Sequence, residues 1–415
     1  MKFLFLTAPG NGHVNPTLPV AQELVARGEE VVYYTTDMFQ ARVERTGATF
    51  RRLDDIFNMP ADEIAKFRKN WQENSPALLE DIMRVMIRYV TNTLPRVPKM
   101  LERLRAEEFD AIVCDPMCAW GRALAEMLEL PTATFYATFA MTKNSSLLRQ
   151  MLSKPKKLPS PKTLVTMLRL QSVAWYMHLR YGTSLLDPKN LFTASESLNI
   201  VPLPRKFQPD ADAFDDRYAF VGPSILPSVV DYDTDLPLEQ LEERQTLYIA
   251  MGTAFTREQI FKTCVDAFAN TRWLVVMATW RELNLGDLPS NFIVRTRVPQ
   301  LEVLQRADVF ITHGGMGSTM GGLWYGVPLV VMPQMPEEAI TADRVVELGL
   351  GIKLDPAANA RDIRDAVETV NADPAYRDRL TDMQTAMREA GGYCKAADEI
   401  QSWLRRAGQI PRVCR

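Results

Sequence analysis

Two short stretches in the first half of the chain place a histidine and a carboxylate where they could act together. The stretch "GNGHVNPTLP" (residues 10–19) carries His13 after an apolar run, and "VCDPMCAW" (113–120) carries Asp115 after another. Loops that follow parallel strands meet at one edge of a sheet. A carboxylate on one imidazole nitrogen raises the basicity of the other, so His13 is a candidate general base. The alternatives are a structural histidine and an aspartate that caps the helix beginning near Cys118.

A third stretch, "FITHGGMGSTMGGLWYGVPLVVMPQMPEEAI" (310–340), places a histidine, a cluster of glycines and two hydroxyl side chains between two apolar runs. His313 ends the first run, and the glycines bring backbone amides to the start of the next helix. Unpaired N–H groups and the helix dipole favour phosphate there, and Ser318 and Thr319 add hydroxyl donors. The Gly-Lys-Ser/Thr of a Walker loop does not follow. The stretch therefore predicts a phosphate site of another kind, because close strand–helix packing explains only some of the glycines.

Alternating strand and helix patterns position these residues. The strands predicted in the first half are "KFLFLT", "VVYYTT", "AIVC", "TATFY" and "LNIV". The pattern restarts at residue 246 with "TLYIAM", "WLVVMA", "FIVR", "DVFIT", "PLVVM" and "GIKL". Helix-length segments separate the strands. Each half therefore predicts a parallel sheet covered on both faces, a doubly wound Rossmann-like α/β domain.

A stretch rich in proline and acid but without periodicity, "VGPSILPSVVDYDTDLPLEQ" (221–240), separates the two halves. Its "DYDTD" resembles the acidic pair of metal-dependent transferases, but its place in a linker favours solvated acids. The predicted organisation is an N-terminal domain (1–222), a linker (223–240), a C-terminal domain (241–393) and a last helix (394–415). That helix packs back on the first domain or completes the second.

Composition narrows the class of protein. Of the 415 residues, 47% are hydrophobic and 24% charged, as in soluble globular proteins with more than one core. The net charge of -3 gives no whole-chain attraction to nucleic acid. The five cysteines are scattered and never spaced C-x-x-C, which favours the reducing cytoplasm over a disulfide framework or a zinc site. We expect no transmembrane helix, and "MKFLFLTAPGNGHVN" predicts a first strand rather than a signal peptide.

One region departs from the alternating pattern. Residues 142–190 contain nine lysines and arginines but a single acid, Asp187, among many methionines and aromatics. The pattern predicts a surface helical excursion with basic side chains extended over it. The alternatives are an adaptable wall of a binding cleft for an apolar ligand and peripheral contact with an anionic membrane.

The chain resembles the macrolide-type branch of the inverting GT-B glycosyltransferases (family 1), which are related to plant secondary-product glucosyltransferases. The resemblance covers nearly the whole chain and rests on "GNGHVNPTLPVAQELVARGEEVVYYTT", "FDDRYAFVGPSI" and "RVPQLEVLQRADVFITHGGMGSTMGGLWYGVPLVVMPQMPEEAITADRVVELGLG". It implies two Rossmann-like domains facing across a cleft. It also implies metal-independent transfer of a sugar from a UDP- or TDP-sugar co-substrate, such as UDP-glucose, to a hydroxyl of a small apolar acceptor, such as a polyketide, macrolide or flavonoid. No cofactor is expected, and the protein would be a monomer or homodimer.

The resemblance also assigns residues to these roles. His13 would be the general base and Asp115 the carboxylate that orients it. The expected donor-binding residues are Thr138, Gly252, Thr253, Arg297, Val298, Gln300, His313, Gly315, Gly317, Ser318, Thr319, Glu337 and Glu338. Among these, Val298 and Gln300 would face the base and ribose, and Glu337 would approach the sugar hydroxyls together with Glu338. The aromatic side chains of the first domain suggest an acceptor site, for which we expect Trp71, Trp120, Phe139 and Trp175.

The chain departs from the family pattern at four positions. Arg297 stands where an aromatic residue often stacks on the base, and Gly317 stands in place of an asparagine. Gly321 occupies the position of the glutamate that binds the ribose hydroxyls, and Glu338 that of the final glutamine. Losing charge-assisted bonds to the ribose weakens donor binding. We therefore expect a donor site that is weaker, altered or compensated by another group.

Two other functions are compatible with parts of the sequence. A nicotinamide-dependent oxidoreductase would use Gly10 and Gly12 for the dinucleotide and Asp37 for its ribose. The third glycine of that fingerprint is Asn15 here, which counts against this function. The other candidate is a catalytically weakened glycosyltransferase homologue that serves as a binding or auxiliary protein.

Overall fold

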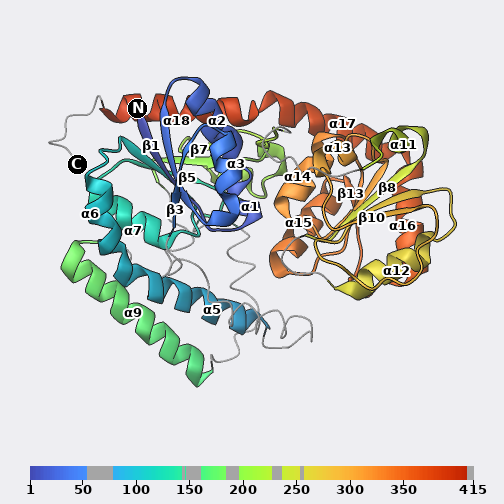
Figure 1. Ribbon diagram of the computed structural model, residues 1–415, viewed down its shortest axis with the longest axis horizontal. Helices are drawn as coiled ribbons and strands as arrows, with labels where there is room; N and C mark the ends of the chain where they lie inside the picture. Colours follow the sequence, from blue (N-terminus) through green and yellow to red (C-terminus); the bar gives the residue numbers. More distant parts are fainter. Residues whose placement is uncertain are drawn as a thin grey trace. The chain divides into compact units, whose positions relative to one another are not determined.

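The computed structural model describes residues 1–53, 78–142, 145, 160–183, 196–226, 236–252 and 257–408. The chain divides into two compact α/β units, whose helices and strands are labelled in Figure 1. The first unit comprises residues 1–202 and 208–221 and the segment that begins at Tyr393. The second comprises Leu203–Phe207 and Gly222–Gly392. The sequence placed a boundary after residue 222 but gave no sign that residues 203–207 belong with the second unit.

The first unit is built on a sheet whose seven described strands are all parallel, in the order β3-β2-β1-β4-β5-β6-β7. The strands are β1 (Lys2–Leu6), β2 (Glu30–Thr35), β3 (Thr49–Arg52), β4 (Ala111–Cys114), β5 (Thr132–Phe135), β6 (Leu198–Val201) and β7 (Tyr218–Phe220). Every residue of β4, β5 and β6 is buried. Such strands need helices on both faces of the sheet.

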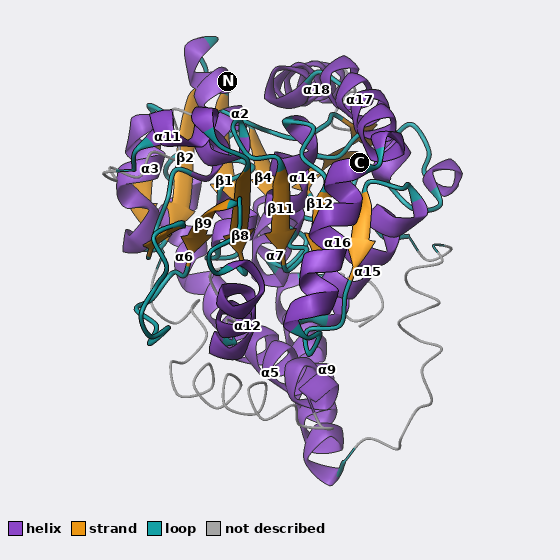
Figure 2. Ribbon diagram, turned by 90° about the vertical axis from the view of Figure 1, so that its right-hand side faces the viewer, coloured by secondary structure: helices purple, strands orange, loops and turns teal. Residues whose placement is uncertain are grey.

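The helices of this unit are α1 (Asn11–Val14), α2 (Leu18–Ala26), α3 (Gln40–Arg45), α5 (Leu78–Thr93), α6 (Val97–Arg105), α7 (Ala119–Leu128) and α9 (Pro161–Tyr181), with short 3-10 turns η1 (Asp37–Phe39), η3 (Leu94–Arg96) and η5 (Ala211–Ala213). Helix α9 runs along α5 at the periphery of the unit, as the views in Figures 1 and 2 show. It lies within the basic, aromatic region of the sequence, where a surface helical excursion was expected.

The last helix, α18 (Gly392–Gly408), belongs almost entirely to the first unit. Arg27 Nη1, at the end of α2, donates to Asp398 Oδ1 over 2.6 Å and to Gln401 Oε1 over 3.0 Å. Farther along the helix, Trp403 Nε1 donates to Ser197 Oγ over 2.8 Å. These bonds fasten the end of the chain to the domain in which it begins.

The second unit repeats the architecture with six described parallel strands in the order β10-β9-β8-β11-β12-β13. They are β8 (Thr246–Ala250), β9 (Leu274–Ala278), β10 (Phe292–Arg295), β11 (Val309–Thr312), β12 (Leu329–Val331) and β13 (Gly351–Lys353). The helices are α11 (Leu238–Glu243), α12 (Glu258–Phe268), α13 (Gln300–Leu304), α14 (Met316–Trp324), α15 (Pro336–Glu347), α16 (Ala360–Ala372) and α17 (Pro374–Glu389), with the 3-10 turn η4 (Arg205–Phe207). The predicted fold class, two doubly wound parallel α/β domains, is confirmed.

Two strands of the first sheet were not predicted. In β3, "TFRR", no residue is buried, and β7 has three residues of which one is buried. Both lie at edges of the sheet, where one neighbour and little burial leave weak apolar patterning. Among the described residues, no helix is long and apolar enough to cross a membrane.

Candidate active site

The sheet of the first unit brings His13 and Asp115 together. Strands β1 and β4 are neighbours in register, so the residues that follow them meet at the carboxyl edge of the sheet. His13 lies in α1, the first element after β1, and Asp115 is the residue that follows β4. His13 Nδ1 lies 2.5 Å from Asp115 Oδ2. The aspartate side chain is 2% exposed and the histidine 32% exposed, so the carboxylate is enclosed while the ring still reaches solvent.

This geometry selects one tautomer of the histidine. An ionised aspartate only accepts hydrogen bonds, so Nδ1 donates and the neutral ring keeps its lone pair on Nε2. Asp115 Oδ1 accepts a second bond, from the backbone N–H of Met117 over 2.7 Å. The carboxylate is thus held at both oxygens, which fixes the ring that it orients.

Two further groups hold the loop that carries His13. Arg42 Nη1, on α3, donates to Asn11 Oδ1 over 2.9 Å and to Asn15 Oδ1 over 2.8 Å, so it clamps both ends of α1. Sequence reasoning missed Arg42 because a single arginine on an amphipathic helix carries no motif.

The hydroxyl of Tyr33 on β2 also holds this loop in place, through hydrogen bonds to residues on both sides of α1. It lies 2.7 Å from Thr17 Oγ1 and 3.1 Å from Thr7 Oγ1, and all three side chains are buried. The bonds join β2 to the segment on either side of α1. Tyr33 was also missed, because in the sequence it is one aromatic within an apolar strand.

In the second unit, His313 follows β11 and is held between glycines. A Cβ added at Gly252 would lie 2.6 Å from His313 Nε2, and one added at Gly315 would lie closer still. Gly252 also has φ +79°, which disfavours any other residue. Burial lowers the pKa of His313 to about 4, although a hydrogen bond to the Ala250 backbone opposes the shift. The imidazole is therefore neutral at physiological pH.

Glu338 lies in the first turn of α15, close to this histidine. Its Oε2 accepts from the backbone N–H of Gln334 over 2.7 Å and of Met335 over 2.9 Å. Its Oε1 lies 3.9 Å from His313 Nε2. Burial raises the pKa of Glu338 to about 7, against the two backbone bonds that favour the charged form. Oε2 of Glu338 is thus occupied by the backbone at the start of α15. The preceding residue, Glu337, is exposed.

Helix α14 begins beside His313, with Gly315 as its N-cap. Gly317 is exposed, and a Cβ added there would meet no heavy atom within 4 Å. Ser318 is half-buried, whereas Thr319 is fully buried and its Oγ1 has no hydrogen-bond partner among the described residues. Of the two predicted hydroxyl donors, only Ser318 is open to solvent.

At position 321, where the family pattern has a glutamate, the glycine of this chain packs closely against α13. A Cβ added at Gly321 would lie 3.1 Å from Leu304 Cδ1 and 3.7 Å from Gln300 Nε2, both on α13. Gly321 thus allows α14 and α13 to approach closely. Gln300, the first residue of α13, is half-buried beside this position, and Val298 just before it is buried.

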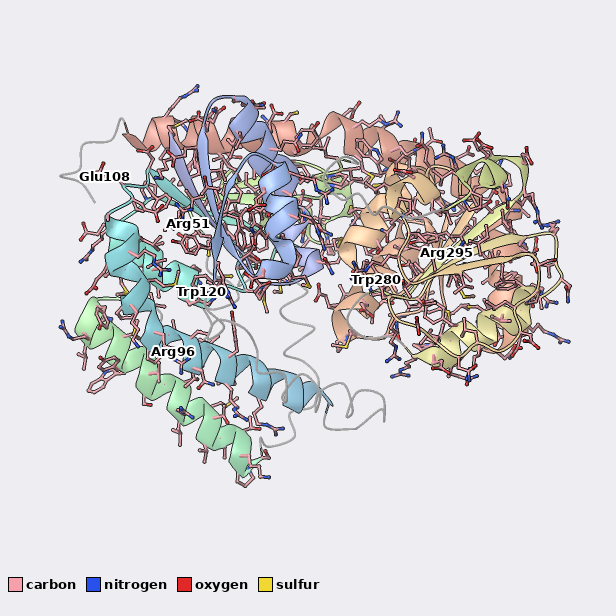
Figure 3. All side chains as sticks on the ribbon, in the orientation of Figure 1. Arg51, Arg96, Glu108, Trp120, Trp280 and Arg295 are labelled. Carbon is pink, nitrogen blue, oxygen red and sulfur yellow. The ribbon has the colours of Figure 1, made fainter. Side chains whose placement is uncertain are left out.

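An aromatic side chain that was not predicted as part of the site, Trp280, lies near Arg297. Trp280 follows β9, and its ring centroid lies 5.9 Å from the guanidinium carbon of Arg297. Figure 3 labels Trp280 in the second unit. Its φ of +61° is rare for a bulky residue. In the sequence it follows "LVVMAT" (274–279), an apolar run without a recognisable motif, so nothing marked it as a binding residue.

The expected acceptor residues have different surroundings. Trp120, on α7 (Figure 3), is fully buried and donates through Nε1 to Tyr89 Oη over 3.1 Å. Its assignment to the acceptor site is wrong, because the ring is part of the core. Phe139 is 4% exposed, whereas Trp175 is 60% exposed on α9.

Three predicted site residues remain: Thr138, Trp71 and Thr253. Thr138 is half-buried, and its Oγ1 has no hydrogen-bond partner among the described residues. Trp71 and Thr253 lie outside the described residues, as does the acidic "DYDTD". Where the chain is described, no group of three or more His, Cys, Asp or Glu side chains could hold a metal ion.

Known proteins resemble this chain over nearly its whole length. The family model described as "Erythromycin biosynthesis protein CIII-like, C-terminal domain" matches residues 266–391. The NDP-glycosyltransferase YjiC of Bacillus licheniformis is 36% identical over 405 residues, which cover 96% of this chain and 97% of YjiC. The chain belongs to the macrolide-type glycosyltransferases.

Two other glycosyltransferases are similar to this chain, one compared by sequence and one by structure. Demethyllactenocin mycarosyltransferase of Streptomyces fradiae is 31% identical over 408 residues, 96% of this chain and 86% of its own. The crystal structure of CalG4, the calicheamicin glycosyltransferase, has a TM-score of 0.77 and 31% identity, and 98% of each chain is covered. The predicted GT-B fold and the dependence on a nucleotide sugar are thereby confirmed.

Proposed function

We propose that this glycosyltransferase inverts the anomeric centre of its donor, with His13 as general base. His13 Nε2 removes the proton of the acceptor hydroxyl while the oxygen attacks the anomeric carbon and the nucleoside diphosphate leaves. Asp115 stabilises the imidazolium that forms, as the buried carboxylate does in a hydrolase triad. The observation that carries the proposal is the 2.5 Å contact between His13 Nδ1 and the enclosed Asp115 Oδ2.

We assign the donor diphosphate to the start of α14. The backbone amides there point away from the helix, and their dipole favours negative charge. Ser318 and the neutral ring of His313 add hydrogen-bonding groups without a positive charge. Such fixed dipoles stabilise a leaving diphosphate without reorganisation, so we propose transfer that needs no metal and no cofactor. Glu337, exposed at the first turn of α15, would reach the sugar hydroxyls.

We place the uracil or thymine ring and its ribose beside Trp280, Arg297 and Gln300. Trp280 offers the aromatic face that position 297 lacks, and Arg297 offers a planar cation next to it. Gln300, beside Gly321, has an amide that can bind ribose hydroxyls. These residues compensate for the departures from the family pattern.

For the acceptor we propose a bulky or flat apolar alcohol or phenol, such as a polyketide, macrolide or flavonoid. The name of the demethyllactenocin mycarosyltransferase, a relative of 31% identity, supports a natural-product acceptor. We keep the cytoplasm as the proposed compartment, which three buried free thiols support: Cys114, Cys118 and Cys264. A monomer or homodimer remains the proposed assembly.

A transfer assay tests the proposal. Purified protein is incubated with UDP- and TDP-sugars and a panel of macrolide and phenolic acceptors, and glycosides are measured by mass spectrometry. We expect product with the wild type and none with a folded His13→Ala variant. Wild-type turnover in that variant would refute the base assignment. No product from any pair, with the protein folded, would favour the auxiliary-protein alternative.

A further inference from the structure

Helix α9 is apolar on two opposite faces. One face includes the buried residues Thr163, Leu170, Ala174 and Met177 and packs along α5. The opposite face carries six large apolar side chains whose exposed fractions run from 48% to 70%. These residues, called here the outer face of α9, are Leu164, Val165, Leu168, Trp175, Tyr176 and Leu179. At 100° per residue they form one stripe centred opposite the buried face.

A helix at the edge of a globular domain needs only one apolar face. The opposite face is usually polar, so apolar residues recur with a period of 3.6 residues and form a single stripe. Single exposed apolar side chains are common, but a contiguous exposed stripe usually marks a site of interaction. No other element holds as many of the exposed large apolar side chains in the described part of the chain. The outer face of α9 therefore calls for an occupant outside the folded unit.

The charges around this stripe indicate what the occupant is. Helix α9 carries Lys162, Arg169 and Arg180 and no acidic residue. All three basic residues fall on one flank of the outer face, where long side chains extend their charges beyond an apolar stripe. The neighbouring α5 adds equal numbers of acids and arginines and so no net charge.

The sequence around α9 strengthens this asymmetry. Residues 142–190 hold nine lysines and arginines and one acid, a net charge of 9 − 1 = +8, in a chain whose net charge is -3. An apolar stripe in a positively charged segment is complementary to a surface whose outer layer is anionic and whose interior is apolar. It fits a second copy of this chain poorly, because a twofold contact would bring the positive segment against itself.

We propose that the outer face of α9 docks the protein on an anionic phospholipid surface. The exposed leucines, Trp175 and Tyr176 enter the boundary between headgroups and acyl chains, and the basic flank meets the lipid phosphates. The contact is peripheral and reversible, and it is weakened by salt. This docking proposal does not depend on the proposed transfer reaction.

Vesicle flotation with the full-length protein tests this proposal. Vesicles of phosphatidylcholine alone are compared with vesicles that contain one quarter phosphatidylglycerol, at low and high salt. We expect at least tenfold stronger binding to the anionic vesicles and a loss of that binding at high salt. The double variant Leu168→Glu/Leu179→Glu should reduce binding at least tenfold. The control Val346→Glu changes another exposed apolar residue, 47% exposed on α15, and should bind like the wild type.

Other outcomes assign the face to something else. Equal or absent binding to both kinds of vesicle overturns the proposal. A dimer in light scattering that Leu168→Glu/Leu179→Glu dissolves would assign the face to a second copy. A large fall in melting temperature of that variant, with Val346→Glu unchanged, would mean that the chain itself covers the face. Glycoside formation from a water-soluble acceptor should be the same in wild type and double variant, which separates this test from that of the transfer reaction.

Discussion

Each unit holds a histidine and a carboxylate at the carboxyl edge of its sheet, yet the two pairs differ in geometry. His13 and Asp115 are in direct contact at 2.5 Å, with the carboxylate enclosed and the ring reaching solvent. His313 and Glu338 are 3.9 Å apart, and both are mostly buried. The pKa of His313 falls to about 4 and that of Glu338 rises to about 7, both because burial disfavours charge.

The difference shows how one residue type serves two purposes. A histidine paired with an enclosed carboxylate is prepared to accept a proton, because the partner stabilises the resulting cation. A histidine enclosed by glycines and without a bonded anion is kept neutral, and so serves as a hydrogen-bonding group. We therefore assign proton transfer to the first pair and donor binding to the second. Variants of each site should separate these functions.

Among the variants that leave both histidines in place, the largest effect is expected for Asp115→Asn. An amide cannot stabilise the imidazolium, and its NH2 group can turn the histidine to the other tautomer. We expect kcat to fall by roughly 10²- to 10³-fold, with little change in donor affinity. Steady-state kinetics and donor titration measure the two quantities. The matched control is Asp37→Asn, an exposed aspartate of the first unit, which should leave kcat unchanged.

Gly315→Ala should affect binding rather than proton transfer. The new Cβ would collide with the ring of His313, which lies between two glycines and cannot move freely. We expect the donor KM to rise on the order of tenfold or more, since about 1.4 kcal/mol is a factor of ten. Gly317→Ala, two residues along the same helix, meets open space and should have a much smaller effect. Equal effects of the two variants would contradict the proposal that Gly252 and Gly315 hold His313 in position for donor binding.

Glu338→Gln should change how stability depends on pH. In the wild type, the raised pKa of Glu338 makes folding less favourable as pH rises from about 4.5 to about 7, because the unfolded chain loses this proton first. The lowered pKa of His313 makes folding more favourable as pH rises from about 4 to about 6.5. The two trends oppose each other where they overlap.

The glutamine variant removes the first trend alone. Its free energy of unfolding should therefore rise more steeply with pH up to about 6.5, by at most about 1.4 kcal/mol per pH unit. Denaturant unfolding of both proteins between pH 4 and pH 7.5 measures the slopes. Identical slopes would mean that Glu338 titrates normally in the folded protein.

Trp280→Ala should have the smallest effect. Loss of an aromatic and cation–π platform is worth about 1 kcal/mol, or about fivefold in affinity. We expect weaker binding of UDP or TDP in calorimetry, with kcat at saturating donor unchanged. Trp273→Phe, a conservative change of a buried tryptophan in the same unit, is the control for general effects on the domain. A fall in kcat with unchanged affinity would move Trp280 from the binding site to the reaction.

Much of the fold was readable in the sequence because buried parallel strands are continuous apolar runs. All six described strands of the second sheet and five of the seven described strands of the first were predicted from such runs. The edge strands β3 and β7 were missed, since they bury few residues. Residues 203–207 return to the second unit through tertiary contacts that no local pattern records.

The candidate site was predictable where chemistry is concentrated in a loop after a strand. His13 and Asp115 were paired from spacing alone, and the structure joins them. Trp120 was misassigned because an aromatic residue near a loop looks the same in sequence whether it faces a ligand or the core. Trp280, Arg42 and Tyr33 were missed, since their roles depend on neighbours far away in the chain.

The division of roles between the two histidines is tested most directly by ¹⁵N NMR of histidine-labelled protein. The chain has three histidines, so the signals lost in His13→Ala and in His178→Ala assign those two residues and leave the remaining signals to His313. The predicted result is a neutral His13 in the tautomer protonated at Nδ1, lost in Asp115→Asn, together with a His313 that stays neutral at pH 5.5. A neutral His13 protonated at Nε2, or a His313 that is charged at pH 5.5, would contradict the account.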